Sequence, residues 1–143
     1  MTCVFCSIVA GDLPAHIVID DEHTMAFLDT KPLFPGHTLL VPRDHHVTLA
    51  ELPTEKIEPV FQRARVLAAV MEGDLGAKGS FVAMNNRVSQ SVPHLHVHVV
   101  PRRPKDGLRG FFWPRQKYDG EGHMAEVAAT LRAGFDGRWA ELE

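Results

Sequence analysis

The chain has 143 residues and a mass of 15.9 kDa, which is enough for one domain with its own hydrophobic core. Its apolar fraction of 45%, charged fraction of 23% and mean hydropathy of -0.09 are typical of a globular protein and exclude disorder and collagen-like repeats. A net charge of -3 gives no overall attraction to nucleic acid or to an anionic membrane. The unusual feature is histidine, which occurs nine times.

The first residues lack the basic segment and the apolar run of a signal peptide, and no later run approaches the roughly 20 apolar residues of a membrane span. We therefore expect a cytoplasmic protein with neither a membrane nor a nucleic acid as partner. Both cysteines lie in one motif, Cys3-x-x-Cys6. This spacing is common for a pair of metal ligands and unsuited to a disulfide framework.

Five short segments have the composition of β-strands. Residues 17–19 and 25–28 flank a polar turn and predict a hairpin. Three further strands are predicted at residues 37–41, 80–85 and 94–100, and the first and last of these stop before a proline.

Two segments have helical periodicity. Apolar residues recur at helical spacing through residues 54–73, and Pro59 predicts an irregular start, with the regular helix beginning near Glu58 and ending at Gly73. A short C-terminal helix is predicted from Met124 to about Leu131, with Gly134 beyond it. The order of elements favours an α+β fold, in which helices cover one face of a five-stranded antiparallel sheet.

The segment His94-Leu95-His96-Val97-His98 alternates imidazole and apolar side chains. In a strand, this pattern places three imidazoles on one face and the apolar side chains in the core. Solvated histidines on an edge strand and a structural metal site are two explanations. Catalysis is a third, because a neutral imidazole attacks phosphorus and leaves readily once the P–N bond is protonated.

The motif His94-x-His96-x-His98-Val99-Val100 resembles the signature of the histidine triad (HIT) superfamily of nucleotidyl hydrolases and transferases. Residues 27–29, 35–42 and 90–92 resemble further segments of that family in the expected order. The resemblance is greatest to the bacterial relatives of the Hint branch, the nucleoside phosphoramidases, and Fhit-like dinucleoside polyphosphate hydrolases are the alternative. It implies a single HIT domain over residues 1–143, with a core at about 3–101 and a variable segment at 102–143.

The resemblance implies catalytic roles for four residues. His96 would be the nucleophile that attacks the α-phosphorus of a purine nucleotide, an AMP or GMP derivative, to form a nucleotidyl-histidine that water hydrolyses. His98 would donate a hydrogen bond to the α-phosphate. Gln90 and Ser91 match side-chain donors to the phosphate or the leaving group, whereas in the alternative interpretation they are solvated residues of a polar loop.

Nucleotide-binding roles are implied in the same way. Asp29 matches a carboxylate that binds the ribose hydroxyls, although a strand-terminal Asp also suits the turn that follows it. His37 and Asn85 match two further residues of the nucleotide site, and Asn86 is the neighbouring alternative to Asn85. The candidate walls of a base slot, each equally suited to an ordinary core, are Phe5, Ile8, Phe27 and Leu28. Apolar walls predict little base selectivity beyond a mild purine preference.

The resemblance also implies a metal site. Many bacterial HIT proteins combine an N-terminal C-x-x-C with a histidine after the third strand and the first triad histidine, which here are Cys3, Cys6, His45 and His94. Four protein ligands describe a closed, structural zinc site. His46 competes with His45 for this role, and two free cysteines without a metal are the alternative.

Family members are typically homodimers with one continuous ten-stranded sheet, so the resemblance implies a homodimer. The aromatic stretch at residues 110–115 suits a subunit contact or a lid. A different class of function is a zinc-stabilised nucleotide-binding or scaffold protein with vestigial turnover. An intact His96 argues against that class, because a binding protein does not need a nucleophile.

Overall fold

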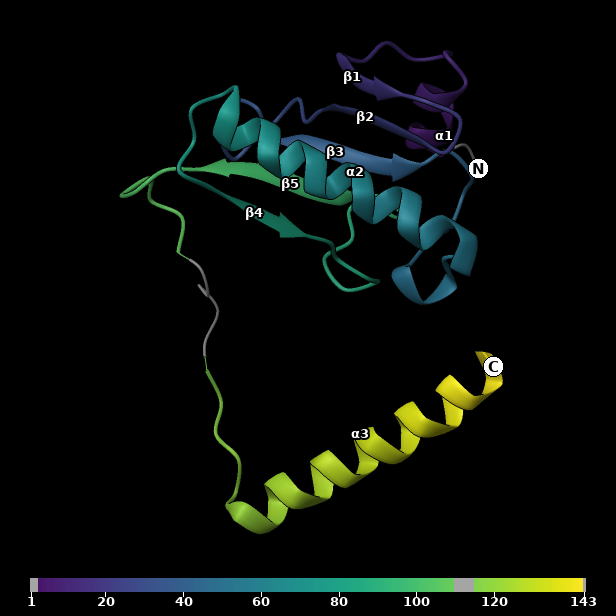
Figure 1. Cartoon of the computed structure of the whole chain (residues 1–143), viewed down its shortest axis with the longest axis vertical. Coiled ribbons are helices and arrows are strands. Elements are labelled where there is room, and N and C mark those ends of the chain that lie inside the picture. Colours follow the sequence, from purple (N-terminus) through teal and green to yellow (C-terminus); the bar gives the residue numbers. More distant parts are fainter. Residues whose placement is uncertain (1–2, 110–114, 143) are drawn as a thin grey trace. The chain divides into compact units, whose positions relative to one another are not determined.

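The protein's structure, a computed structural model, describes residues 3–109 and 115–142 (Figure 1). The chain divides into two compact units, Met1–Asp106 and Gly107–Glu143. Among the described residues, the first unit contains a five-stranded sheet, two α-helices and a short 3-10 helix (Leu49–Glu51), and the second contains one α-helix. Most of the aromatic stretch for which we expected a subunit contact or a lid, residues 110–114, lies outside the described residues.

The five strands are β1 (Ile17–Asp20), β2 (Thr24–Leu28), β3 (Thr38–Pro42), β4 (Gly79–Ala83) and β5 (Val97–Arg102). They are ordered β1-β2-β3-β5-β4 across the sheet. Every neighbouring pair is antiparallel. This arrangement confirms the predicted α+β class and the five-stranded antiparallel sheet.

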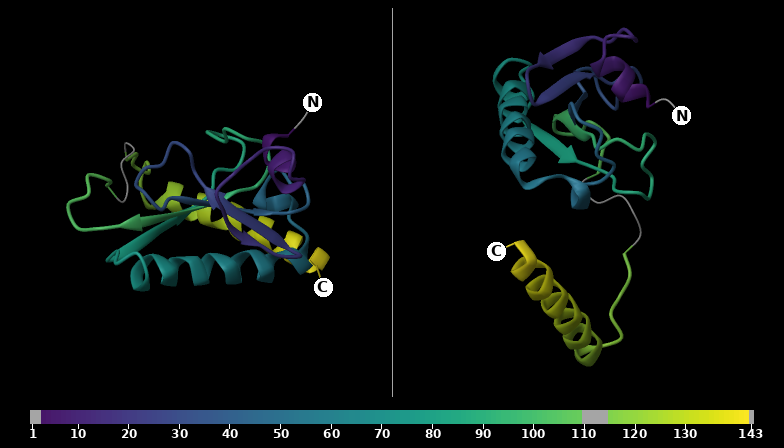
Figure 2. Two further views of the ribbon diagram at one scale, coloured as in Figure 1. Left: turned by 90° about the horizontal axis from the view of Figure 1, so that it is seen from above. Right: turned by 90° about the vertical axis from the view of Figure 1, so that its right-hand side faces the viewer.

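Helices lie on both faces of this sheet, so the prediction of helices on one face was wrong. Helix α2 (Thr54–Gly73) covers one face and the short helix α1 (Val4–Val9) lies against the other (Figure 2). The α2 side of the core contains Ala26, Leu40, Val97 and Val99, and the α1 side contains Phe5, Met25, Phe27, Leu39 and Val41. Helix α1 was not predicted because six residues carry too little periodicity to be recognised.

Helix α2 begins at Thr54 and continues through Pro59, so the expected irregular start near Glu58 was also wrong. Pro59 removes only one intrahelical hydrogen bond, to the carbonyl of Glu55, and that residue is exposed to water. The buried residues of α2 that pack on the sheet are Val60, Ala64, Leu67 and Met71. The burial of this stripe outweighs the local cost of the proline.

Helix α3 (Glu121–Leu142) is longer than predicted and passes through Gly134. A glycine inside a helix costs about 1 kcal/mol but ends the helix only where the chain turns into a left-handed conformation. The helix has no buried residue, so the described part of the second unit forms no second core. No helix in the described ranges is long and apolar enough to cross a membrane.

Strand β5 begins at Val97 and runs to Arg102, later than the predicted span of 94–100 at both ends. Its pairing with β3 extends only from Val97 to Val99, so Pro101 faces no β3 partner and its missing N–H leaves no carbonyl of β3 unpaired. His94 and His96 therefore lie in the extended segment that enters β5. Strand β4 ends at Ala83, and Asn85 lies just beyond it.

Candidate functional site

The three triad histidines face the α1 side of the sheet. Their apolar neighbours Leu95, Val97 and Val99 are fully buried in the core under α2. The alternation of the sequence is thus preserved, although only His98 lies within β5. His94 and His96 are also buried, with exposed fractions of 0% and 3%. The solvated edge-strand explanation for this face is therefore wrong.

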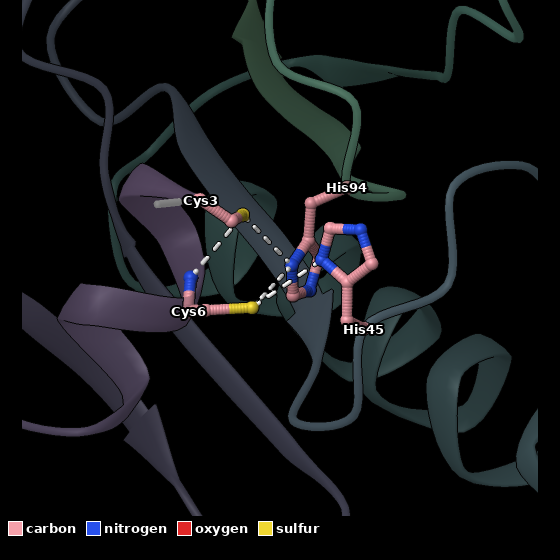
Figure 3. A group of neighbouring side chains, drawn as sticks. All are labelled: Cys3, Cys6, His45 and His94. Atoms are coloured by element: carbon pink, nitrogen blue, oxygen red, sulfur yellow. Dashed lines mark hydrogen bonds between the residues drawn. The ribbon is translucent and has the colours of Figure 1, made fainter. Parts of the chain in front are cut away.

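The first group of side chains on this face comprises Cys3, Cys6, His45 and His94, which we call the metal cluster (Figure 3). Their four ligand atoms all lie within 4.8 Å of one another. The Nδ1 atom of His94 lies 3.4 Å from the Cys3 Sγ and 3.5 Å from the Cys6 Sγ. The Nδ1 atom of His45 lies 3.3 Å from the Cys6 Sγ.

The orientation of His94 is fixed by a buried hydrogen bond on its other nitrogen. Its Nε2–H donates to the carbonyl of Pro42 at 2.9 Å, so the lone pair of Nδ1 points toward the two sulfurs. Burial is the main cause that lowers the pKa of His94, and the ring is therefore neutral at pH 7. A neutral imidazole with an accepting Nδ1 is what a metal ligand requires.

The thiols are brought together by α1. Cys3 is the N-cap of this helix, and its Sγ accepts a hydrogen bond from the Cys6 backbone N–H at 3.4 Å. Burial is the main cause that raises the pKa of the Cys6 thiol, and the neighbouring Cys3 adds to it. A cation bound between the two sulfurs would offset this effect by stabilising the thiolate form. Two sulfurs and two imidazole nitrogens are a common donor set for tetrahedral zinc, so the residues fit this metal.

Residue His46, the competitor of His45, lies outside the metal cluster. Its backbone carbonyl accepts the Leu95 N–H at 2.7 Å, which supports the segment that enters β5. Its ring Nε2 is buried without a hydrogen-bond partner among the described residues. The spacing from the third strand that favoured His45 thus agrees with the geometry.

The second group is a chain of hydrogen bonds through His37 and His98, which we call the imidazole chain. The Leu33 N–H donates to Nδ1 of His37 at 3.0 Å, so the proton of the neutral His37 ring lies on Nε2. That Nε2 lies 2.9 Å from Nδ1 of His98 and donates to it. The proton of His98 is then on its Nε2, which remains available to donate to a bound anion.

The electrostatics keep this chain neutral. Burial is the main cause that lowers the pKa of His98 to about 4, and the neighbouring rings of His96 and His37 add to the effect. Burial also lowers the pKa of His37, against an opposing contribution from Asp29. At pH 7 both rings therefore act as hydrogen-bond donors without carrying positive charge.

The middle histidine has the geometry of a nucleophile. The Nδ1–H of His96 donates to the carbonyl of His94 at 2.8 Å, which leaves the lone pair on Nε2. The ring lines a cavity of about 290 Å³. Eight of the predicted site residues line this cavity: Phe5, Ile8, Phe27, Leu28, Asp29, Ser91, His96 and His98.

Sequence reasoning missed other parts of this wall. The cavity is also lined by Val4, Pro14, Ala15 and Leu39. Val4 and Ile8 lie four residues apart and so on one side of α1, a spacing that would have revealed an apolar helical face had α1 been recognised. Pro14 and Ala15 are brought to the cavity by the loop after α1, and no local sequence signal marks them.

Asp29 makes the turn contact that its position suggested and also lines the cavity. One carboxylate oxygen, Oδ1, accepts the Lys31 N–H at 2.8 Å and closes the turn after β2. The other, Oδ2, lies 3.7 Å from Nε2 of His37, and the residue lines the cavity. The turn therefore fixes the carboxylate at the cavity wall.

Gln90, Asn85 and His37 are predicted site residues that do not line the cavity. The amide of Gln90 holds its own loop: Nε2 donates to the Val47 carbonyl at 2.6 Å and Oε1 accepts the Arg87 N–H at 2.9 Å. These bonds give the amide a supporting role in the loop, and its contact with phosphate stays a prediction. Asn85 is exposed and lies next to the loop, and its neighbour Asn86 uses its side-chain oxygen to accept the Leu49 N–H at 2.7 Å.

Comparison with known proteins identifies the family. The model of the HIT domain matches residues 10–105, which include β1 to β5, α2 and all three triad histidines. The chain belongs to the HIT domain family. Its matched region ends close to the boundary of the first unit, so α3 lies outside the family's common domain.

Relatives and solved structures agree with this assignment. An uncharacterized HIT-like protein of Methanocaldococcus jannaschii is 39% identical over 73% of this chain and 82% of its own length. The adenosine 5'-monophosphoramidase HNT1 of Saccharomyces cerevisiae is 30% identical over 82% and 73%. The crystal structure of a HIT family member from Bacillus subtilis has a TM-score of 0.83 at 30% identity, covering 93% of this chain and 96% of that one. A zinc-bound histidine triad family protein from Mycobacterium smegmatis has a TM-score of 0.71 at 36% identity, covering 94% and 98%.

Proposed function

We propose that this HIT protein hydrolyses the P–N bond of purine nucleoside phosphoramidates, or the equivalent bond of related adenylylated compounds, through a nucleotidyl-His96 intermediate. One observation carries the proposal. The hydrogen bonds fix opposite tautomers on two adjacent rings, so that a lone pair on Nε2 of His96 and a proton on Nε2 of His98 are presented side by side. An attacking atom and a donor for phosphate oxygen are thereby supplied together.

In the first step, the lone pair on Nε2 of His96 forms a bond to the α-phosphorus while the bond to the leaving nitrogen breaks. The amine leaves with a proton taken from solvent. Negative charge on the phosphate oxygens is stabilised by the Nε2–H of His98 and by the hydroxyl of Ser91, which lines the cavity. Because His96 Nδ1–H remains bonded to the carbonyl of His94, the positive charge that develops on the ring is also stabilised.

In the second step, water attacks the same phosphorus, loses a proton to solvent, and the P–Nε2 bond breaks, which releases the nucleoside monophosphate and restores neutral His96. The P–N bond of a phosphoimidazole is weak, so this step needs little assistance compared with hydrolysis of a serine ester. In this proposal Asp29 binds the ribose hydroxyls and the apolar residues of α1 and β2 enclose the base, which agrees with their positions in the wall of the cavity.

The comparisons support the choice of substrate class at a coarse level. Some relatives are named as adenosine 5'-monophosphoramidases, and an Arabidopsis thaliana relative, 31% identical over 74% of this chain, is named adenylylsulfatase HINT3. All of these names describe cleavage at an adenosine-linked α-phosphate. The cavity of this chain, with its apolar walls and one carboxylate, is compatible with that shared portion of the substrates.

We further propose that the metal cluster binds a structural zinc ion and that the protein is a homodimer. The zinc proposal rests on the donor set and on the zinc-bound relative. The dimer proposal rests on β4, which ends the sheet and carries the exposed Val82, and on the exposed Ile57 and Phe61 of α2. Light scattering should give about twice the 15.9 kDa of one chain, and a monomeric mass would refute the dimer.

The proposed activity is tested by a single-turnover incubation with adenosine 5'-phosphoramidate. Wild type should release AMP and pass through a transient increase in protein mass equal to one adenylyl group, and His96→Ala should do neither. No release and no adduct, with AMP still bound, would instead indicate a nucleotide-binding protein. Residual turnover in His96→Ala above about 1% of wild type would contradict nucleophilic catalysis by this residue.

A further inference from the structure

Helix α1 links the metal cluster to the cavity. It carries Cys6, follows Cys3 at its N-cap, and places Phe5 between the two thiols. Phe5 is the only buried residue of this helix, with an exposed fraction of 6%. Phe5 is therefore the buried anchor of α1 on the sheet, and the partly buried Cys3, Ile8 and Val9 pack against the same core.

The ring of Phe5 packs edge-on against the nucleophile. Its centroid lies 5.1 Å from that of His96, with an angle of 83° between the planes. It makes similar contacts with His94 at 5.9 Å and with Phe27 at 5.3 Å. These separations lie in the range of attractive edge-to-face pairs, which depend on orientation as well as on area. Phe5 thus covers one side of the His96 ring and restricts its rotation.

Helix α1 is not stable by itself. Six residues are far below the length at which an isolated helix forms in water. In the described part of the chain, the hydrogen bonds that join α1 to other elements run from the two thiols to His45 and His94. A metal ion that binds all four side chains would replace these weak contacts with coordination bonds and fix the helix in place.

We propose that Phe5 is a positioning residue for His96, and that occupancy of the metal cluster controls whether Phe5 packs against that ring. With a metal bound, α1 is docked and His96 is held with Nε2 toward the cavity. Without a metal, α1 separates from the sheet and Phe5 leaves the ring. His96 then becomes accessible and keeps its hydrogen bond to the His94 carbonyl without the packing contact that restricts the ring on one side. The metal affects turnover through this packing contact and takes no part in the chemistry.

The accessibility of His96 tests this proposal without a substrate. The full chain is treated briefly with diethyl pyrocarbonate, which modifies unprotonated imidazole, and mass spectrometry assigns the modified ring within the tryptic peptide of residues 88–102. Zinc-loaded and chelator-treated wild type are compared with zinc-loaded Phe5→Leu. We expect His96 to react about tenfold faster in chelator-treated wild type and in Phe5→Leu than in zinc-loaded wild type, because local opening then exposes the ring.

Two other histidines serve as internal controls. His37 is 4% exposed and is held on the far side of His98, so it should stay protected when α1 alone separates. His123 lies in the other unit and should react at one rate throughout. Unchanged protection of His96 in metal-free protein would overturn the proposal. Equal exposure of His96 and His37 would also overturn it, since the metal would then hold the whole domain.

A matched variant separates positioning from binding of the base. Ile8 is on the same helix and lines the same cavity, and no ring contact joins it to His96. Ile8→Ala should raise KM and leave the protection of His96 unchanged, whereas Phe5→Leu should lower kcat more than it raises KM. This kinetic arm rests on the proposed function, but the modification arm does not, so failure of the two is distinguishable.

The kinetic effects of the metal and of Phe5 should also overlap. If Phe5 transmits the influence of the metal, removal of zinc should lower kcat in wild type and lower it little further in Phe5→Leu. Independent, multiplicative effects would overturn the link between the two, even if each change reduced activity. Zinc content measured for every sample ensures that Phe5→Leu is compared while it still contains its metal.

Discussion

The metal cluster and the imidazole chain both lie near the start of β5, on the α1 side of the sheet, and their hydrogen bonds suit them to different ligands. In the metal cluster, the outer nitrogen of His94 donates to a carbonyl, which leaves Nδ1 as a ligand. In the imidazole chain, a backbone N–H donates to Nδ1 of His37, and Nε2–H of His37 donates to Nδ1 of His98. The proton of the His98 ring therefore lies on its Nε2. The first arrangement presents a lone pair to a cation and the second presents a proton to an anion. All of these residues are histidines. Whether a ring presents a lone pair or a proton is therefore decided by the hydrogen-bond partner of its other nitrogen.

The difference also explains why the second group is a poor metal site. Asp29, His37 and His98 have ligand atoms within 4.8 Å of one another, as the metal cluster does. A cation there would have to displace the proton between His37 and His98, and the Leu33 N–H prevents that proton from moving to Nδ1 of His37. Spacing alone therefore does not distinguish the two groups, whereas their hydrogen bonds do.

The largest expected effects come from removing the imidazole of His94 or of His96 in separate variants, because each variant should lose a different property. His96→Ala should reduce kcat at least about a thousandfold, because the nucleophile is removed, and should retain the metal. His94→Ala should lose the metal and several kcal/mol of stability, since one of four ligands and a buried hydrogen bond disappear. Turnover, metal content and urea unfolding of both variants test this. Loss of metal in His96→Ala would show that the two groups are one site.

The next effect concerns the donor to His98. His37→Leu removes the hydrogen bond that fixes the His98 tautomer, and kcat should fall roughly 10- to 100-fold, as for other residues that orient a functional histidine. His37→Gln keeps a side-chain N–H and should recover part of that loss. Nitrogen NMR of the imidazoles should show His98 with mixed tautomers in His37→Leu only. Equal activity of the two variants would mean that the tautomer of His98 does not matter.

Much of this comparison could be predicted from the sequence, because it depends on residue spacing. Alternation placed the histidines on one face, and family resemblance selected Cys3, Cys6, His45 and His94, which the structure brings together. The five strands and the antiparallel class followed from composition and turn residues. These are local or pattern-based properties.

The parts that could not be predicted depend on long-range partners. The tautomers of His94 and His37 are set by the Pro42 carbonyl and the Leu33 N–H, and main-chain groups carry no sequence signal. The amide of Gln90 donates to the carbonyl of Val47, a partner far away in the sequence that the local motif does not indicate. The regular helix through Pro59 likewise depends on packing against the sheet, which outweighs local propensity.

A smaller effect is expected on the pH dependence of folding stability, which tests whether the imidazole chain is neutral. The pKa of His98 is about 4 in the folded chain and about 6.5 when unfolded, so between these values only the unfolded chain binds the proton. Folding stability should therefore be constant above pH 6.5 and fall below it, by up to about 1.4 kcal/mol per pH unit from this residue. The groups that face His98 are His37, His96 and Asp29, and all three are present in both proteins compared.

The measurement is urea unfolding of wild type and His98→Gln between pH 4 and pH 7. The variant lacks the half-buried imidazole, so its stability should depend less steeply on pH in this window. Parallel curves for the two proteins would show that His98 is solvated enough to bind a proton in the folded state. In that case the imidazole chain would not be neutral, and its contrast with the metal cluster would be weaker.

The smallest effect is expected from a substitution in the loop between β4 and β5, which leads to the metal cluster and the imidazole chain. Ser89 has a φ of 60°, a left-handed conformation that costs a residue with a Cβ atom about 1 kcal/mol relative to glycine. Ser89→Gly should therefore raise the free energy of unfolding by up to about that amount, as should Lys105→Gly, with a φ of 61°, in a distant turn. Ser80→Gly in β4 should do the opposite, since glycine weakens a strand. A gain at Lys105 without one at Ser89 would mean that the serine conformation is compensated within the loop, and that this loop holds Ser91 and His94 more rigidly than its backbone angles indicate.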